Sequence, residues 1–126
     1  MDQKLKDEII GDLIQLPLAL NEKTTELYSL RKLRDDKVMV MKAIESALKI
    51  AIEGARDLND KPQFSNALRR DAELERRKTI DQDYAVAEDE FNKLREKIEN
   101  LSLVVEFMNN KFKSARALAL LAGDEK

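Results

Sequence analysis

Five basic residues near the middle of the chain are the side chains best suited to contact an anion. Arg69 and Arg70 come first, and Arg76, Arg77 and Lys78 follow closely. Clustered guanidinium and ammonium groups of this kind bind the phosphates of nucleic acids. The sequence therefore contains one candidate nucleic-acid contact surface, next to Lys61.

The same cluster also has a purely structural interpretation. Acidic residues are interleaved with the five cations, and Glu45, Glu53 and Asp57 are expected within about one turn of them across the fold. Only Phe64 lies close enough in the sequence to stack on a base. We therefore favour a solvated, salt-bridged surface over a phosphate site.

Other reactive groups are scarce. The chain has no histidine and no cysteine, which removes Ser–His and Cys–His pairs, the usual zinc ligands and the Glu-x-x-His di-iron motif. Gly11, Gly54 and Gly123 stand alone, so no glycine-rich phosphate loop is present. The run Glu88–Asp89–Glu90 could bind Mg²⁺, but on a helix such carboxylates are more typically solvated or salt-bridged. We predict no catalytic residues, no metal, no cofactor and no enzyme activity.

The composition favours long helices in a single domain. The 126 residues are 38% charged, with 3 Gly, 2 Pro and 5% aromatic residues. Acidic and basic residues nearly balance, at a net charge of -2, which argues against a general polyanion binder. No apolar run has the roughly 18 residues of a membrane span, and "MDQKLKDEIIGD" does not resemble a signal peptide. We expect a cytoplasmic protein without membrane contact.

The second half of the chain carries an uninterrupted apolar repeat with alternating steps of three and four residues. Such a repeat is typical of the seam between two long packed helices. Its members are Tyr84, Ala87, Phe91, Leu94, Ile98, Leu101, Val105, Met108, Phe112, Ala115, Ala119 and Ala122. Extending it backward adds Ile80 and then meets Arg77, Glu73 and Arg70.

The first half carries a similar seam that is interrupted by Lys23, Arg34 and Lys37. Its apolar members are Ile9, Leu13, Leu16, Leu20, Leu27, Leu30, Met41, Ile44, Leu48, Ala51, Ala55 and Leu58. Because proline lacks a backbone N–H, we expect a kink or break near Pro17, with Pro17 opening the main helix.

The stretch "KPQFSNALRR" is predicted to be the turn between the two helices. Asn59 can end the first helix in the left-handed conformation, and Pro62 prevents its continuation. Ser65 or Asn66 can cap the second helix. Phe64 can pack against its first turn near Leu68.

These elements predict an all-α fold, a long antiparallel helical hairpin of the coiled-coil type. The first helix covers about 2–58, the turn 59–65 and the second helix about 66–122. Paired residues should have numbers that sum to about 124 or 125, which matches Arg34 with Glu90 and places Asp12 near Lys113. One alternative stays open: Asp81 favours a helix start, so the second helix can break there and give a shorter, thicker bundle.

Many apolar residues lie outside both seams and lack cover in a single hairpin. Their number predicts self-association, most simply a dimer that forms a four-helix bundle. They are Ile10, Ile14, Leu18, Leu33, Val40, Ile50, Ile52, Leu103, Val104, Phe107, Leu118, Leu120 and Leu121.

The segment from Pro62 to Leu121 resembles small coiled-coil proteins encoded by phages and prophages. The shared features are "PQFSNALRRDAELERR", then "DQDY", then "EFMNNKFKSARALALL". The chain lacks the proline that is often present in the acidic segment of that group. The resemblance implies a phage accessory protein, from a replication or recombination module, and implies no catalytic residues.

Two functional hypotheses follow. The first is a non-enzymatic, self-associating coiled-coil protein that binds another protein, and the second is a nucleic-acid-binding accessory factor that uses the basic cluster. The self-association hypothesis relies on the central seam residues. These are Leu27, Leu30, Met41, Ile44, Leu48, Phe91, Leu94, Ile98, Leu101, Val105, Met108 and Phe112.

Overall fold

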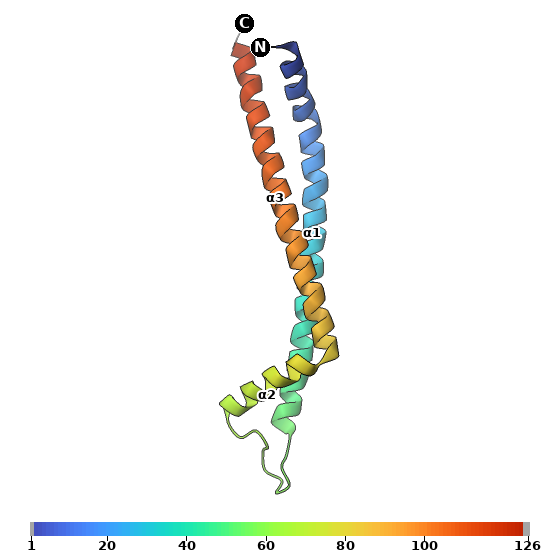
Figure 1. Ribbon diagram of the computed structural model, residues 1–126, viewed down its shortest axis with the longest axis vertical. Coiled ribbons are helices and arrows are strands. Elements are labelled where there is room, and N and C mark those ends of the chain that lie inside the picture. The colour runs from blue at the N-terminus through green and yellow to red at the C-terminus, as the bar shows by residue number, and fades with distance from the viewer. Residues whose placement is uncertain (1, 125–126) are drawn as a thin grey trace. The chain divides into compact units, whose positions relative to one another are not determined.

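The computed structural model describes residues 2–124 and contains three helices in that range. Helix α1 spans Gln3–Gly54, α2 spans Ala67–Ile80 and α3 spans Gln82–Asp124 (Figure 1). Outside the helices, the described residues form turns and one isolated β-bridge, between Arg56 and Pro62. The all-α helical hairpin predicted from the sequence is confirmed. Within residues 2–124, no helix combines the length and the apolar character needed to cross a membrane.

The chain divides into two compact units, and α1 and α3 contribute residues to both. The first unit contains the residues up to Arg31 and those from Glu96 onward, and the second contains Lys32–Arg95.

In the first unit, α1 and α3 run antiparallel. One groove between them is lined by Ile9 and Ala119, and another is lined by Leu27 and Val105, so numbers rise along α1 as they fall along α3. The apolar side chains at the centre of this pairing are buried. They are Ile9, Leu16, Leu27, Ile98 and Ala115. The seam residues therefore supply the core of this unit.

Helix α1 continues through Pro17, so the helix neither breaks nor starts at this residue, and the expected kink stays a prediction. A proline inside a helix removes one backbone hydrogen bond and crowds the preceding turn. Leu16, directly before Pro17, and Ile9, about two turns earlier, are 8% and 5% exposed. Because both are buried in the first unit, packing holds the helix together on the N-terminal side of Pro17.

In the second unit, α2 adds a third helical segment to the pair formed by α1 and α3. Lys37 of α1 forms a salt bridge with Glu90 of α3 in place of the predicted partner Arg34. Arg34 instead hydrogen-bonds the adjacent Asp35. On α1, Ile52 is only 2% exposed and borders a groove that is also lined by Leu74 of α2. Helix α2 thus covers a side of α1 that a two-helix hairpin leaves open.

The predicted single helix over 66–122 is wrong, because the helix is interrupted at Asp81. Asp81 has an extended backbone, with φ -75° and ψ 120°, and its N–H donates to the carbonyl of Arg77 at 2.9 Å. Its side-chain Oδ1 accepts a hydrogen bond from the N–H of Tyr84 at 2.7 Å. One residue therefore ends α2 and caps α3, and Figure 1 shows α2 turning away from the line of α3. Ile80, expected on the seam, is 65% exposed.

The first helix ends at Gly54, earlier than the predicted residue 58. The side chain of Asp57 accepts hydrogen bonds from the N–H groups of Asn59 and Lys61, at 2.9 and 3.0 Å. These bonds form a tight turn that competes with helix continuation. The left-handed conformation falls at Asp60, with φ 60°, and not at Asn59 as expected. Leu58 is fully exposed as a result.

The start of α2 follows the predicted cap. Asn66 is extended, and its Oδ1 accepts from the N–H of Arg69 at 2.8 Å. The predicted contact between Phe64 and Leu68 is wrong, since Leu68 is 81% exposed. The Phe64 ring instead lies 5.8 Å from the guanidinium of Arg77, a cation–π contact.

Replacing Ile52 by alanine should lower the free energy of unfolding by about 2–5 kcal/mol, because it leaves a cavity between α1 and α2. The matched control is Ile50→Ala, since Ile50 lies two residues away and is 71% exposed. The control should change stability by no more than about 0.5 kcal/mol. Urea unfolding followed by circular dichroism measures both values. Equal losses in the two variants would contradict the packing of α2 described above.

Candidate functional site

All five residues of the basic cluster lie on α2. Arg69 and Arg70 are in its first turns, and Arg76, Arg77 and Lys78 are in its last turns. The helix forms here because Asn66 caps its start and Asp81 ends it. The structure thus brings the cluster onto one short helix of the second unit.

Two arginines of the cluster converge on one carboxylate of the same helix. Arg76 donates from Nε to Glu73 Oε2 at 3.1 Å and from Nη2 to Oε1 at 2.6 Å. Arg77 donates from Nε to the same Oε1 at 2.8 Å. Hydrogen bonds from Arg76 and then from Arg77 lower the pKa of Glu73 from 4.5 to about 2. The carboxylate therefore stays ionised and partly neutralises both guanidinium groups.

The other basic side chains of α2 are also engaged, apart from the exposed Arg69. Lys78 lies 3.3 Å from Glu75 Oε1 and 5.2 Å from the centre of the Tyr84 ring. Arg70 donates from Nη1 to the carbonyl of Phe64 at 3.4 Å. The contacts of Lys78 with Tyr84 and of Arg70 with Phe64 join α2 to the segments on either side of it.

Among the described residues, no salt bridge joins the cluster to Glu45, Glu53 or Asp57, although Glu53 and Arg70 border the same groove. Glu45 lies 3.5 Å from Lys49 on its own helix, and Asp57 accepts N–H groups of the loop. Because α2 leaves the line of α3 at Asp81, its arginines find their acidic partners three or four residues away on α2 itself.

The acidic run on α3 is distributed around the helix. Asp89 pairs with Lys93 at 2.9 Å, and Glu90 pairs with Lys37. Among residues 2–124, no three acidic side chains come together in a way that could hold a metal ion. The run therefore has basic partners at two of its three positions.

The predicted central seam residues lie on the inner sides of the helices in both units. Leu27 and Ile98 are buried, and the others are half-buried. The half-buried members are Leu30, Met41, Ile44, Leu48, Phe91, Leu94, Leu101, Val105, Met108 and Phe112. Half-burial is the expected result where one helix has a single neighbour.

The apolar residues predicted to lie off the seams are exposed, except for Ile52. Sequence reasoning missed further exposed apolar side chains, which are Leu5, Tyr28, Met39, Leu68 and Val86. The signal for Leu5 was its position beside the seam, four residues before Ile9. The surface of the described residues therefore carries many apolar side chains that nothing in the single chain covers.

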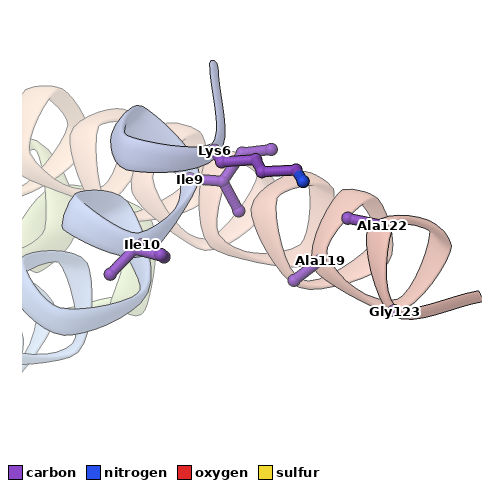
Figure 2. Close-up of a pocket in the computed structure, with 6 residues that line it drawn as sticks. All are labelled: Lys6, Ile9, Ile10, Ala119, Ala122 and Gly123. Atoms are coloured by element: carbon purple, nitrogen blue, oxygen red, sulfur yellow. The ribbon is translucent and has the colours of Figure 1, made fainter. Parts of the chain in front are cut away.

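A shallow groove lies where the ends of α1 and α3 meet in the first unit. Figure 2 shows Lys6, Ile9 and Ile10 of α1 near Ala119, Ala122 and Gly123 of α3. The α3 side consists of small residues, so the groove offers space but no polar group except Lys6. Such a groove is mainly apolar, and its lining lacks the groups needed for chemistry.

Comparison with known proteins gave no match to a family model, to a curated protein or to a solved structure.

The pH dependence of stability should reveal the Glu73 cluster. Because the folded pKa of Glu73 is lowered from 4.5 to about 2, its stabilising effect is present above pH 4.5 and is lost as the pH falls toward 2. The difference in unfolding free energy between the natural chain and Glu73→Gln should therefore shrink over this range. Urea unfolding at a series of pH values measures it.

The control uses the same substitution in an Arg76→Gln/Arg77→Gln background, where the two hydrogen-bond donors are gone. There the effect of Glu73→Gln should lose this pH dependence. If the difference in unfolding free energy between the natural chain and Glu73→Gln stayed constant down to pH 2, the assigned contacts would be contradicted.

Proposed function

We propose that this chain is a non-enzymatic, self-associating coiled-coil protein whose exposed apolar surface mediates protein–protein interaction. The observation that carries the proposal is the amount of surface that a single chain leaves uncovered. The resemblance of residues 62–121 to phage and prophage coiled-coil proteins extends the proposal to a phage accessory factor in the host cytoplasm.

The solvent-accessible surface of the chain is larger than that of a compact monomer of the same mass. The chain exposes 9509 Å² for a mass of 14.5 kDa. A compact monomer of that mass exposes about 6,900 Å², so the excess is about 2,600 Å². A standard interface removes only about 800 Å² from each partner. The excess is therefore large enough to supply a stable interface.

Exposed apolar side chains outnumber buried ones. Among the described residues, 19 large apolar side chains are exposed, whereas 9 apolar residues are buried. Isolated exposed apolar residues are normal, but a surface with this ratio is typical of interaction sites. Association with further copies or with another protein would cover them.

The composition supports the non-enzymatic part of the proposal. The chain has neither histidine nor cysteine, the most versatile acid–base and nucleophilic side chains. The strongest pKa shift belongs to Glu73, and two arginines of the same helix account for it. That carboxylate is therefore held in its ionised form and is poorly suited to transfer protons near neutral pH.

The alternative is a nucleic-acid-binding accessory protein of a phage replication or recombination module. It requires several cations that are free to neutralise phosphates. In α2, Arg76 and Arg77 share the carboxylate of Glu73, and Lys78 lies beside Glu75. Phosphate binding would have to displace these acids, which weighs against the alternative.

Sedimentation equilibrium at micromolar concentration should return a mass at least twice the 14.5 kDa of one chain. The reason is the exposed apolar area, which association removes from water. A single species of 14.5 kDa across the concentration range would refute self-association.

Fluorescence anisotropy with a labelled single-stranded oligonucleotide should show no binding at physiological salt. If Arg69, Arg70, Arg76, Arg77 and Lys78 did bind phosphates, four or five contacts would cost about a hundredfold in affinity between 50 and 200 mM salt. The control is Arg76→Ser/Arg77→Ser. Micromolar, salt-sensitive binding that this control abolishes would support the nucleic-acid alternative instead.

A further inference from the structure

One ion pair marks a particular side of the first unit. Lys111 Nζ of α3 lies 3.9 Å from Asp12 Oδ1 of α1, and both residues flank the seam without belonging to it. In packed helices, residues seven positions apart lie nearly above one another. The pair therefore places Leu5 and Ala19 of α1 on the same side of the hairpin.

The same spacing on α3 brings Val104 and Leu118 to this side, on either side of Lys111. Phe107 and Leu121 follow them by three residues and lie next to them on the helix surface. We call this set of exposed apolar residues the Phe107 strip. It consists of Leu5, Val104, Phe107, Leu118 and Leu121, exposed by 40%, 43%, 67%, 38% and 60%.

The Phe107 strip has apolar ends and a charged centre. Leu5, Leu118 and Leu121 lie toward one end, and Val104 and Phe107 lie toward the other, with Asp12 and Lys111 between them. A purely apolar partner would bury this ion pair without new polar contacts, which is costly. A suitable partner therefore needs one acid and one base at its centre, flanked by apolar residues.

We propose that the side of the first unit that carries the Phe107 strip packs against the same side of a second copy of this chain, about a two-fold axis parallel to the helices. The proposal rests on the self-association proposed above and assigns it to one surface. In this arrangement both copies use the same side of the hairpin, as a closed dimer requires.

The charges select the direction of the axis. With the axis parallel to the helices, each α1 lies over α3 of the other copy, so Asp12 faces the partner's Lys111. With an axis across the helices, each α1 lies over the other α1, and Asp12 faces the partner's Asp12. Like charges placed directly opposite each other destabilise an interface, so the first arrangement is favoured.

The sizes of the apolar residues agree with this arrangement. Leu5 then lies level with the partner's Leu118, and two medium-sized side chains meet. Val104 and Phe107 lie near the level of the partner's Ala19, whose small side chain leaves room for the Phe107 ring. Large residues thus face small ones where the helices approach closely.

The opposite side of the first unit has a different character. There, Ile10 and Ile14 of α1 are exposed, and Ile10 borders the groove that Ala119, Ala122 and Gly123 of α3 line. On this side, Ile14 supplies a matched control for Phe107.

Sedimentation equilibrium of the full chain with Phe107→Asp tests the assigned surface. The substitution should raise the dimer dissociation constant more than tenfold, because it places a charge in the dry part of the interface. The control is Ile14→Asp, since Ile14 is 63% exposed against 67% for Phe107. It should leave dimerisation unchanged. Circular dichroism should show equal helix content in both variants, as expected for exposed positions.

Cross-linking tests the direction of the axis, because the natural chain has no cysteine. An oxidised mixture of Leu5→Cys and Leu118→Cys chains should form a disulfide-linked heterodimer. A mixture of Leu5→Cys and Ala19→Cys chains should not.

The outcomes separate this inference from the proposed function. A natural chain that stays monomeric would overturn both. A dimer that tolerates Phe107→Asp, or that is lost with Ile14→Asp instead, would overturn the surface while self-association stands. Cross-linking of Leu5→Cys with Ala19→Cys alone would overturn the axis.

Discussion

A helix that packs against a single neighbour can bury only one strip of its surface, and this limit shapes the whole chain. In the first unit, Ile9 and Ile98 fill the strip between α1 and α3, while Phe107 and Ile14 remain exposed on either side of it. In the second unit, α2 gives the end of α1 a second neighbour. Ile52, which turns toward α2, is accordingly the most deeply buried large side chain among the described residues.

The break at Asp81 links this packing to the electrostatics of α2. Because the helix changes direction there, Leu74 can cover Ile52, and the arginines of α2 are left with acidic neighbours on their own helix. The basic cluster therefore stabilises a short helix that would otherwise be marginal in isolation. The same rearrangement accounts for the exposed Ile80 and for the contact between Arg77 and Phe64.

Local patterns in the sequence were enough to predict the helical hairpin and to place the cap of the second helix at Ser65 or Asn66. Each depends on residues within a few positions of one another, such as Asn66 and Arg69. Other features depend on distant contacts. The apolar repeat was compatible both with a continuous helix through Ile80 and with a break at Asp81. The packing of Leu74 over Ile52 cannot be predicted from the spacing of apolar residues. The break considered at Pro17 is absent for the same reason, because the burial of Leu16 outweighs a local preference.

The candidate surface was predicted in part. The excess of apolar residues outside the seams was evident, but the side on which each one lies required the contact between Asp12 and Lys111. The observed partner of Arg76 and Arg77, Glu73, is one of the acidic residues interleaved with the cluster, whereas the salt bridges expected across the hairpin depended on the direction of α2.

The antiparallel pairing also has a consequence for how the chain folds. In the second unit, a salt bridge joins Lys37 to Glu90, which are close to each other in sequence compared with the pair in the first unit. That pair, Asp12 and Lys111, is separated by roughly a hundred residues. Closing a longer loop costs more entropy. Contacts between distant residues form slowly unless nearer contacts have already shortened the loop. We expect the second unit to form first and act as the nucleus. The two ends of the chain would then come together last, as the hairpin closes from its loop outward.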